Sequence, residues 1–341
     1  MKILIIGSDK SYAIERAYLK YFREYGYEVS VYPAQTYFFD YLQKSIVNKI
    51  AFRIGLKWIY KIINTELRKQ IVEVDPDVLF IFKGMEIFPE SLKWARLMGI
   101  KTYNYNPDNP FLFSGRGSGN SNITASIGLY DAHFTYNLKV KSEMESSFDI
   151  PTYWIPFGFD LSEIVYESLM LEAEINKICF VGNPDRHRIQ FLKELADNGF
   201  IIDLYGVNWQ RFIQHKNISI HAPVFADEMW SILRKYRVQL NPLRIHNLDS
   251  HGMRSFEIPA VGGIMLAPRT SEHQMLFTEG KEAFYYSSTE EAMNHIKKLL
   301  SLNQGEADKI RRNARLRSVS SGYSYKNRAK EILDIIDSVE T

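Results

Sequence analysis

A strand-helix-strand pattern that occurs twice is the feature that most constrains the fold of this chain. Within residues 2–32, a continuous apolar run ends in a glycine and is followed by a helical pattern and a second strand-like run. Such a unit in about 30 residues is typical of a doubly wound parallel sheet. The same order of elements begins again within residues 177–206. We therefore expect two α/β domains, each built around a parallel sheet.

The length of the chain agrees with this interpretation, because 341 residues exceed the roughly 100 to 200 of a usual single domain. Ligands of open α/β sheets bind beyond the carboxyl ends of the strands, so we expect a site in a cleft between the two domains. The pattern predicts a first domain at 1–160, a linker at 161–175, a second domain at 176–310, and a C-terminal helix at 311–341 that can cross back to the first domain.

Charge and cysteine content exclude several classes of protein. The 42 Lys and Arg residues nearly balance the 40 Asp and Glu residues, so the chain lacks the basic field of a nucleic-acid-binding protein. Its one cysteine, Cys179, can form neither an internal disulfide nor a cysteine-based zinc site. The first apolar run is too short for a signal peptide, and no run of about 18 apolar residues predicts a transmembrane helix. These features favour a cytoplasmic protein.

The segment at residues 44–69 departs from this charge balance. It contains seven cations and one acid, Glu66, interleaved with apolar and aromatic residues. The pattern predicts a pair of basic, amphipathic helices, whose charged face is either solvated or in contact with anionic lipid or a lipid-diphosphate acceptor. In the second case the protein is peripheral on the inner face of the membrane. The cations are Lys44, Lys49, Arg53, Lys57, Lys61, Arg68 and Lys69.

The greatest density of candidate ligand-binding residues lies at 241–268. If a helix begins near Gly252, its N–H groups and dipole form a site for a diphosphate, and Arg254 can offset phosphate charge. Glu257 follows about one turn later, where a carboxylate can accept hydrogen bonds from vicinal hydroxyls. Asp249 precedes this helix. The alternative is a capped surface helix with solvated charges.

A second candidate cluster lies at a strand-to-helix turn, where Arg186, His187 and Arg188 follow Gly182 and Asn183. A cation near the N-terminus of a helix opposes the helix dipole. The cluster therefore predicts an anionic partner, and we favour this interpretation over a solvated helix start.

We expect no metal site. Asp75 and Asp77 form a D-x-D pattern, but a proline turn that leads into an apolar strand explains both residues. Among the histidines, His133 is expected to pack within a strand, whereas His246 and His251 are better candidates for contacts with a ligand.

In the first half, Asp108 follows an expected strand within the sequence NPDNP. A carboxylate here can act as a general base on an acceptor hydroxyl, although Asn, Pro and Asp residues also form turns. The glycine- and serine-rich segment at 113–120 is either a mobile loop over the acceptor site or a plain flexible loop.

Several of these motifs together resemble a known family. Asp249, Gly252 and Glu257 resemble the acid-x7-acid signature of retaining glycosyltransferases of the GT-B fold. Residues 176–300 are similar to the spore-maturation-type, group 1 (family 4-like) glycosyltransferases, through FVGN, an arginine before a helix, YGxxW, NP, RSFEIPAVGG and FTEGKEAFYY. The resemblance implies two Rossmann-like domains that face each other across a cleft, with the acceptor on the first and a nucleotide-sugar on the second.

The resemblance also implies roles for individual residues. Glu257 would bind the ribose, and Asp249 would face the transferred sugar, although the usual first acid of the signature is Glu. Asp108 lies where relatives contact the donor sugar or activate the acceptor, so Asp108 and Asp249 are the expected catalytic residues. The diphosphate would be held by Arg188, Arg254 and the backbone at Gly252 and Met253. Further donor contacts are expected at Gly182, Asn183, Tyr205, Asn241 and His251.

From these observations we expect a metal-independent glycosyltransferase with no cofactor, which uses a nucleotide-sugar, with UDP-sugars favoured. The acceptor would be a bacterial surface glycan, a glycolipid or a protein, and the acid-x7-acid resemblance favours retention of the anomeric configuration. The alternatives are a nucleotide-sugar epimerase on the same fold and a non-catalytic envelope or spore-coat binding protein. A dinucleotide dehydrogenase is disfavoured, because GSDKSY replaces the glycine-rich fingerprint after the first strand.

Overall fold

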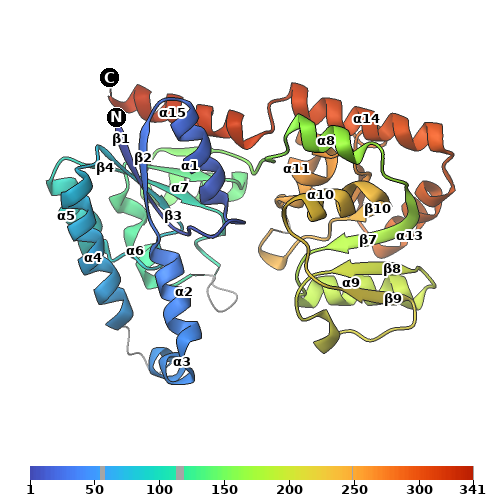
Figure 1. Cartoon of the computed structure of the whole chain (residues 1–341), viewed down its shortest axis with the longest axis horizontal. Coiled ribbons are helices and arrows are strands. Elements are labelled where there is room, and N and C mark those ends of the chain that lie inside the picture. The colour runs from blue at the N-terminus through green and yellow to red at the C-terminus, as the bar shows by residue number, and fades with distance from the viewer. Residues whose placement is uncertain (54–57, 113–118, 248, 341) are drawn as a thin grey trace. The chain divides into compact units, whose positions relative to one another are not determined.

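A computed structural model describes residues 1–53, 58–112, 119–247 and 249–340 of the chain (Figure 1). The chain forms two compact units. Unit 1 contains Met1–Pro156 together with the C-terminal segment from Arg328, and unit 2 contains Phe157–Asn327. Residues 161–175, for which the sequence suggests a linker, lie in unit 2.

Unit 1 is built on a parallel sheet. Its strands are β1 (Lys2–Ile6), β2 (Glu28–Tyr32), β3 (Val78–Phe82), β4 (Lys101–Asn106), β5 (Ala132–Thr135) and β6 (Thr152–Trp154). Their order is β2-β1-β3-β4-β5-β6, so the direction of strand addition reverses between β1 and β3. β3, with the sequence VLFIF, is buried along its whole length, as expected for a strand covered on both faces.

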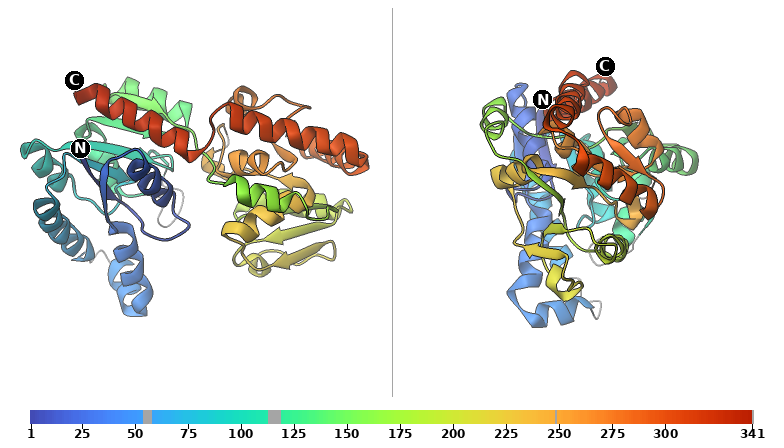
Figure 2. Two further views of the ribbon diagram at one scale, coloured as in Figure 1. Left: turned by 45° about the horizontal axis from the view of Figure 1, so that its top comes forward. Right: turned by 90° about the vertical axis from the view of Figure 1, so that its right-hand side faces the viewer.

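Helices cover both faces of this sheet (Figure 1). They are α1 (Ile14–Glu24), α2 (Ala34–Lys44), α3 (Ile46–Arg53), α4 (Trp58–Val74), α5 (Pro89–Leu97), α6 (Ser121–Ser126) and α7 (Leu138–Phe148). On one face, Phe38 of α2, Ile63 of α4 and Leu92 of α5 pack in one core cluster with Ile6 and Ile81. α3 lies at the outer end of the unit, beyond the sheet (Figures 1 and 2).

Aromatic side chains fill the other face of the unit 1 sheet. The ring centroid of Tyr18 in α1 lies 6.1 Å from that of Phe80 and 5.6 Å from that of Tyr105. The C-terminal helix α15 (Tyr325–Glu340) rejoins this unit, where the hydroxyl of Tyr27 donates a 2.5 Å hydrogen bond to Asp337.

Unit 2 is built on a second parallel sheet. Its strands are β7 (Ile175–Val181), β8 (Ile202–Tyr205), β9 (Ile218–His221), β10 (Tyr236–Leu240), β11 (Met265–Pro268) and β12 (Phe284–Tyr286). Their order is β12-β11-β10-β7-β8-β9, so strand addition reverses between β7 and β10. In this pair Val238 lies opposite Ile178, and both side chains are buried in the core.

The helices of unit 2 are α8 (Glu163–Leu169), α9 (Arg186–Asp197), α10 (Ala226–Lys235), α11 (Arg254–Ala260), α12 (Ser271–Leu276), α13 (Thr289–Ser301) and α14 (Gln304–Ser320). Leu192 of α9 and Ile296 of α13 pack together in the core cluster that contains Val238. α8, α10, α11 and α14 contact one another in a separate layer. No helix in the described part of the chain is long and apolar enough to cross a membrane.

The predicted fold class is confirmed, because both units are parallel α/β sheets. Two details differ from the predictions. Residues 311–341, predicted as one C-terminal helix, contain the end of α14 and the whole of α15 (Figure 2), and Gly322 between them has a left-handed conformation, with φ of +67°. β9 was not expected.

Candidate functional site

The carboxyl ends of β7 and β10 meet at the point where strand addition reverses in unit 2. The two strands are hydrogen-bonded neighbours, with Phe180 opposite Leu240. The loops that leave this point begin at Gly182 and at Asn241. Doubly wound sheets bind ligands at such a point, because the two loops diverge there. We call this place the β7–β10 site.

The YGxxW sequence fixes the loop that follows β7. Trp209, which is fully buried, donates from Nε1 to the carbonyl oxygen of Gly182 at 2.8 Å. Gly206 approaches the same oxygen so closely that a Cβ atom would lie 2.2 Å away. The N–H of Val207 donates to Oδ1 of Asn183 at 3.3 Å. The loops after β7 and β8 are thus bonded to each other, which explains the glycine and the tryptophan of the motif.

Arg188 connects the two loops of the β7–β10 site from the first turn of α9. Its Nε donates to the carbonyl oxygen of Pro242 at 2.8 Å, and its Nη1 donates to that of Asn183 at 3.1 Å. Its guanidinium carbon lies 5.2 Å from the ring centroid of Phe180. The backbone N–H of Arg188 is capped by Asp185, the N-cap residue of α9. Arg188 is therefore held in one place rather than solvated.

Other cations lie near Arg188. Burial lowers the pKa of Arg188 most, Asp185 opposes the shift, and the like charges of Arg244 and Arg254 lower the pKa further, to about 10. Arg188 remains charged at neutral pH, so mutual repulsion among the guanidinium groups favours a bound anion. Our sequence predictions did not include Arg244. The signal that could have revealed it is its position just after the NP that follows β10.

Arg254 and Glu257 form an ion pair across the first turn of α11. Arg254 also donates from Nε to the carbonyl oxygen of Val181 at 3.2 Å, which ties the guanidinium to the end of β7. The structure thus brings Arg188, Arg254 and Glu257 to the same end of the sheet, where the sequence predicts contacts with a diphosphate and a ribose.

The start of α11 differs from the predicted position. The helix begins at Arg254 and its N-cap residue is Met253, whereas the sequence predicts a start at Gly252. The N–H of Gly252 donates to the hydroxyl of Ser255 at 3.1 Å. Gly252 and Met253 are partly exposed, so this stretch of backbone lies at the surface of the site.

A network of buried hydrogen bonds supports the backbone of residues 252–255 on its inner side. The hydroxyl of Ser255 accepts a hydrogen bond from Nδ2 of Asn241 at 3.0 Å and lies 2.8 Å from Nε2 of His273. Burial lowers the pKa of His273 to about 4, so its ring is neutral at pH 7. Because Asn241 is itself buried, the structure places it beneath the site as a support for residues 252–255.

His251 is also fully buried. Its Nδ1 lies 2.6 Å from Glu272, and its Nε2 accepts a hydrogen bond from the N–H of Phe157 at 3.4 Å. The carboxylate of Glu272 also accepts a hydrogen bond from Ser250. These contacts place His251 within the core next to Gly252, where it can orient the backbone.

Tyr205 lies in the interior of unit 2. Its hydroxyl is 2.9 Å from that of Tyr236, which donates to Asp203 at 2.8 Å, and its ring stacks on His221 with centroids 4.5 Å apart. Asp249, by contrast, is exposed between the 3-10 turn at Ile245–Asn247 and α11. Its neighbour Leu248 and the side chain of His246 lie outside the described residues.

In unit 1, the predicted catalytic residue Asp108 lies two residues beyond β4 and is about two-fifths exposed. Its carboxylate forms a 2.6 Å ion pair with Lys83, which follows β3 and is buried. Lys83 was not predicted from the sequence. The predicted acceptor loop at 113–120 lies mostly outside the described residues, which resume at Gly119.

A third ionisable group lies close to this ion pair. Glu86 is buried, and burial raises its pKa to about 7, with an opposing effect of Lys83 and a smaller effect of Glu15 in the same direction as burial. Burial also raises the pKa of Glu15. The end of the unit 1 sheet at β1, β3 and β4 therefore carries several buried ionisable groups, Lys83, Glu15 and Glu86.

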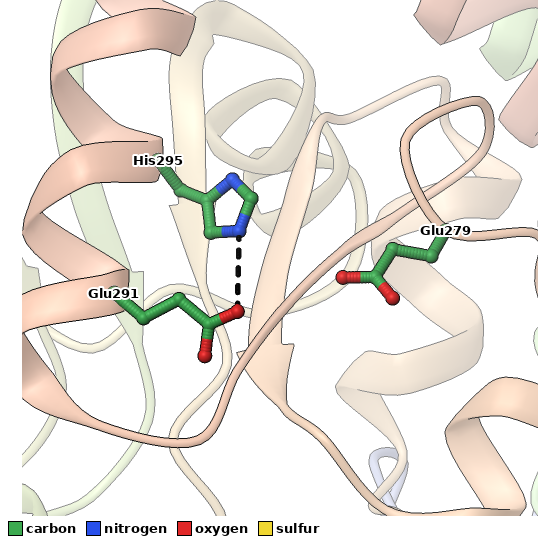
Figure 3. A group of neighbouring side chains, drawn as sticks. All are labelled: Glu279, Glu291 and His295. Carbon is green, nitrogen blue, oxygen red and sulfur yellow. Dashed lines mark ion pairs between the residues drawn. The ribbon is translucent and has the colours of Figure 1, made fainter.

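One group of side chains in the described part of the chain has the spacing of a metal site: Glu279, Glu291 and His295 (Figure 3). Arg269, however, forms ion pairs with both carboxylates. The hydrogen bonds of these carboxylates raise the pKa of Arg269. Because a guanidinium already neutralises both acids, this group fits an ion-pair network better than a metal site. His133, the predicted packed histidine, is buried and bonded to Ile127, which confirms that prediction.

One family model matches part of the chain, mostly in unit 2. Residues 186–334 match the family model described as glycosyl transferase-like. A search of curated proteins by sequence found no match.

Solved structures resemble the whole chain. Sucrose-phosphate synthase from Thermosynechococcus elongatus has a TM-score of 0.70 at 11% identity, with 99% of each chain covered. Anabaena HepE in complex with UDP-glucose has a TM-score of 0.67 at 13% identity and covers 99% of this chain and 100% of its own. UDP-GlcNAc 2-epimerase from Neisseria meningitidis bound to UDP-GlcNAc has a TM-score of 0.59 at 15% identity, with coverage of 99% and 100%.

Proposed function

We propose that the protein is a glycosyltransferase of the GT-B fold that transfers a sugar from a UDP-sugar to a surface glycan, a glycolipid or a protein. The complex of Anabaena HepE with UDP-glucose supports this choice of donor. We propose that the nucleotide binds at the β7–β10 site of unit 2 and that unit 1 binds the acceptor.

The observation that carries this proposal is the group of guanidiniums at the β7–β10 site. Arg188 and Arg254 are each tied to loop or strand backbone, and Arg244 lies near them. The two phosphates of a UDP-sugar carry negative charges that can neutralise these guanidiniums. When the sugar–phosphate bond breaks, the departing diphosphate gains negative charge, and prepositioned cations stabilise it without reorganisation. This supports a metal-independent reaction with no cofactor.

The other predicted acids can be given roles that are consistent with a diphosphate bound to these guanidiniums. Oε2 of Glu257 engages Arg254, and Oε1 makes no hydrogen bond to another described residue, so Oε1 can accept from ribose hydroxyls. We propose that the exposed Asp249 contacts the transferred sugar and that retention of configuration follows. We propose Asp108 as the acceptor-side carboxylate.

A thermal-shift screen with UDP-, GDP-, dTDP- and CMP-sugars tests the donor assignment, because a ligand that binds the native state raises the melting temperature. We expect the largest shift with a UDP-sugar, and its loss in Glu257→Ala. Glu290→Ala, on the partly exposed first turn of α13, is the matched control and should keep the shift. No shift with any nucleotide-sugar would contradict the proposal.

The epimerase on the same fold remains the second candidate, and the likeness to the Neisseria meningitidis enzyme favours keeping it. The two activities differ in their products. An epimerase changes the sugar of the bound nucleotide-sugar without any acceptor, whereas a transferase releases UDP in proportion to glycosylated acceptor. A non-catalytic binding protein would bind the donor and show neither product, so Asp249→Ala would have no turnover to remove.

We also propose that α3 contacts an anionic membrane surface. No side chain of α3 is buried, and Ile46, Val47 and Ile50 are 73%, 66% and 52% exposed. Between Asp40 and Glu66 the sequence contains no acid, while Lys49 and Arg53 are exposed on α3 itself. An exposed apolar stripe beside cations is the pattern of an interfacial helix. Residues 54–57 of this basic segment lie outside the described residues.

Co-sedimentation with vesicles tests this contact. Vesicles that contain phosphatidylglycerol should bind the protein and pure phosphatidylcholine vesicles should not. Ile46→Ser with Ile50→Ser, or Lys49→Glu with Arg53→Glu, should each reduce binding about tenfold or more. Leu171→Ser in unit 2, where the leucine is 90% exposed, is the control. Equal binding by all variants would exclude α3 as the contact.

A further inference from the structure

A cavity of about 200 Å³ lies in unit 2 at the end of the sheet that is opposite to the carboxyl ends of the strands, where the β7–β10 site lies. Glu174 lines it just before β7 begins, and Arg234 lines it just before β10 begins. The cavity is therefore at the amino ends of the two strands whose carboxyl ends form the β7–β10 site. Its other lining residues come mainly from α8 and α14 and are Tyr166, Met170, Glu172, Gly262, Gln304, Asp308, Arg311 and Arg312.

Arg234 is a buried cation without an acidic partner. It is only 8% exposed, and no carboxylate of a described residue lies within ion-pair distance of it. Its Nε makes no hydrogen bond to the described residues, and its Nη2 reaches only the sulfur of Met170, at 3.8 Å. A buried charge without a partner costs free energy. The position of Arg234 in the last turn of α10 offsets part of this cost but gives no acceptor to Nε.

Arg311 adds a second orphan donor to the same cavity. It is 3% exposed, and its Nε makes no hydrogen bond within the described part of the chain. Its Nη2 lies 2.6 Å from Glu174, so only one side of the guanidinium is neutralised. Two buried guanidinium groups thus present unmatched donors to one small space.

Each acid that lines the cavity has an ion-pair or hydrogen-bond partner, although Oε2 of Glu174 accepts no hydrogen bond from a described residue. Glu172 accepts hydrogen bonds from Ser231 at 3.0 and 2.7 Å and forms an ion pair with Lys235. Glu174 pairs with Arg237 as well as with Arg311. Asp308 accepts a hydrogen bond from Gln304. Lys235 and Arg237 are counted with the lining residues because they pair with lining acids. Five cations then compare with three acids, so two positive charges are uncompensated. The cations are Arg234, Lys235, Arg237, Arg311 and Arg312, and the acids are Glu172, Glu174 and Asp308.

We propose that this cavity is a binding site for a small oxyanion, either inorganic phosphate or the phosphate or carboxylate group of a larger molecule. The planar fork of Arg234 matches two oxygens of such a group. The volume is several times the roughly 30 Å³ that one water occupies, so a phosphate ion fits. Met170, Gln304 and Arg312 are exposed and form the rim through which the ion enters. This site is independent of the proposed donor site.

Phosphate can also bind at Arg188, so the test uses the Arg188→Gln protein as its reference. Sodium phosphate, sodium acetate and sodium chloride are compared at equal ionic strength by thermal unfolding of the full chain. We expect phosphate to raise the melting temperature by about 2 to 4 °C relative to chloride. Adding Arg234→Gln should abolish this shift, and Arg234→Lys should reduce it, because lysine keeps the charge but loses the fork. The acetate arm shows whether a carboxylate suffices.

Calorimetric titration of phosphate into the same proteins gives the stoichiometry. One site per chain in Arg188→Gln that is lost in Arg188→Gln/Arg234→Gln supports the proposal. A phosphate effect that survives Arg234→Gln, or none beyond that of chloride in Arg188→Gln, overturns it. Binding of a UDP-sugar to Arg234→Gln should match that of the unmodified protein, which separates this test from that of the donor site.

Discussion

At the scale of single residues, burial decides how the candidate groups behave. His133 in unit 1 and His273 in unit 2 are both buried, and burial lowers the pKa of each to about 4. Glu86 shows the opposite effect, since burial raises its pKa to about 7. These side chains therefore link the stability of the two units to pH in opposite directions.

The histidines should weaken the fold as the solution becomes acidic. Their pKa values are near 6.5 when unfolded and about 4 when folded, so the unfolded chain binds more protons between pH 6.5 and pH 4. Stability is full above about pH 6.5 and is lost as pH falls toward 4. Each histidine contributes up to roughly 1.4 kcal/mol per pH unit in this window. Urea unfolding at a series of pH values from 4 to 7 measures this effect. The free energy of unfolding should depend less steeply on pH in His273→Gln than in the unmodified protein, and an equal pH dependence would contradict this role.

Glu86 should have the reverse effect. Its folded pKa of about 7 exceeds the unfolded value of 4.5, so its contribution is present below pH 4.5 and is lost as pH rises through 7. Glu86→Gln should therefore stabilise unit 1 at pH 8 by an amount on the order of 3 kcal/mol or less, with little change near pH 4.5. Urea unfolding at both pH values measures this difference. Glu90→Gln, at an exposed residue in the first turn of α5, is the control and should show no such pH dependence.

At the scale of elements, the loops after β7 and β8 depend on a close approach of their backbones. A Cβ atom at Gly206 would lie 2.2 Å from the carbonyl oxygen of Gly182 and 2.9 Å from Nε1 of Trp209. Neither neighbour can move without breaking the hydrogen bond between them. The loop that carries Asn183, and through it Arg188, is positioned by this contact.

Gly206→Ala should thus destabilise unit 2 by about 2 kcal/mol or more and weaken the binding of a UDP-sugar. Gly128→Ala makes the same chemical change where no atom lies within 4 Å, and it should be nearly silent. Melting temperatures together with calorimetric titration measure both effects. Equal stability of the two variants would show that the contact is not needed.

Strands β3 and β7 could be predicted because they contain buried apolar runs, VLFIF and ICFV. β9 could not, because its side chains alternate between partly buried and exposed. No helix was predicted at residues 34–44, where α2 lies, because the predicted helix pair followed the charge pattern, which begins only at Lys44. At the site, Arg188, Arg254 and Glu257 could be found from residue type and spacing. The burial of Asn241 and His251 could not, because it depends on Ser255, Glu272 and Phe157, which reach them only through the fold.

At the scale of the whole molecule, the C-terminal segment returns to unit 1 after α14 has packed on unit 2. Ile332, Leu333 and Ile336 of α15 are almost fully buried. Unit 1 therefore contains residues from both ends of the chain, and the residues between these two segments form unit 2.

Leu333→Ala should destabilise unit 1 by about 2 to 5 kcal/mol, because it leaves a cavity under α15. Donor binding by unit 2 should change little. Hydrogen exchange can follow the two units separately, with faster exchange expected in β1 and β3 and unchanged exchange in β7 and β10. Leu316→Ala, at a leucine of α14 that is 66% exposed, should alter neither. Faster exchange in β7 rather than β1 would refute this assignment of α15.

Calorimetric titration of a UDP-sugar into the unmodified protein and into Arg188→Gln/Arg254→Gln tests the donor site itself. We expect saturable binding at one site per chain and a Kd at least about 100-fold higher in the double variant, because each charged hydrogen bond to the diphosphate contributes roughly 1.5 to 3 kcal/mol. Equal Kd values in a double variant that melts normally would contradict the assignment of the diphosphate to the guanidiniums at the ends of β7 and β10.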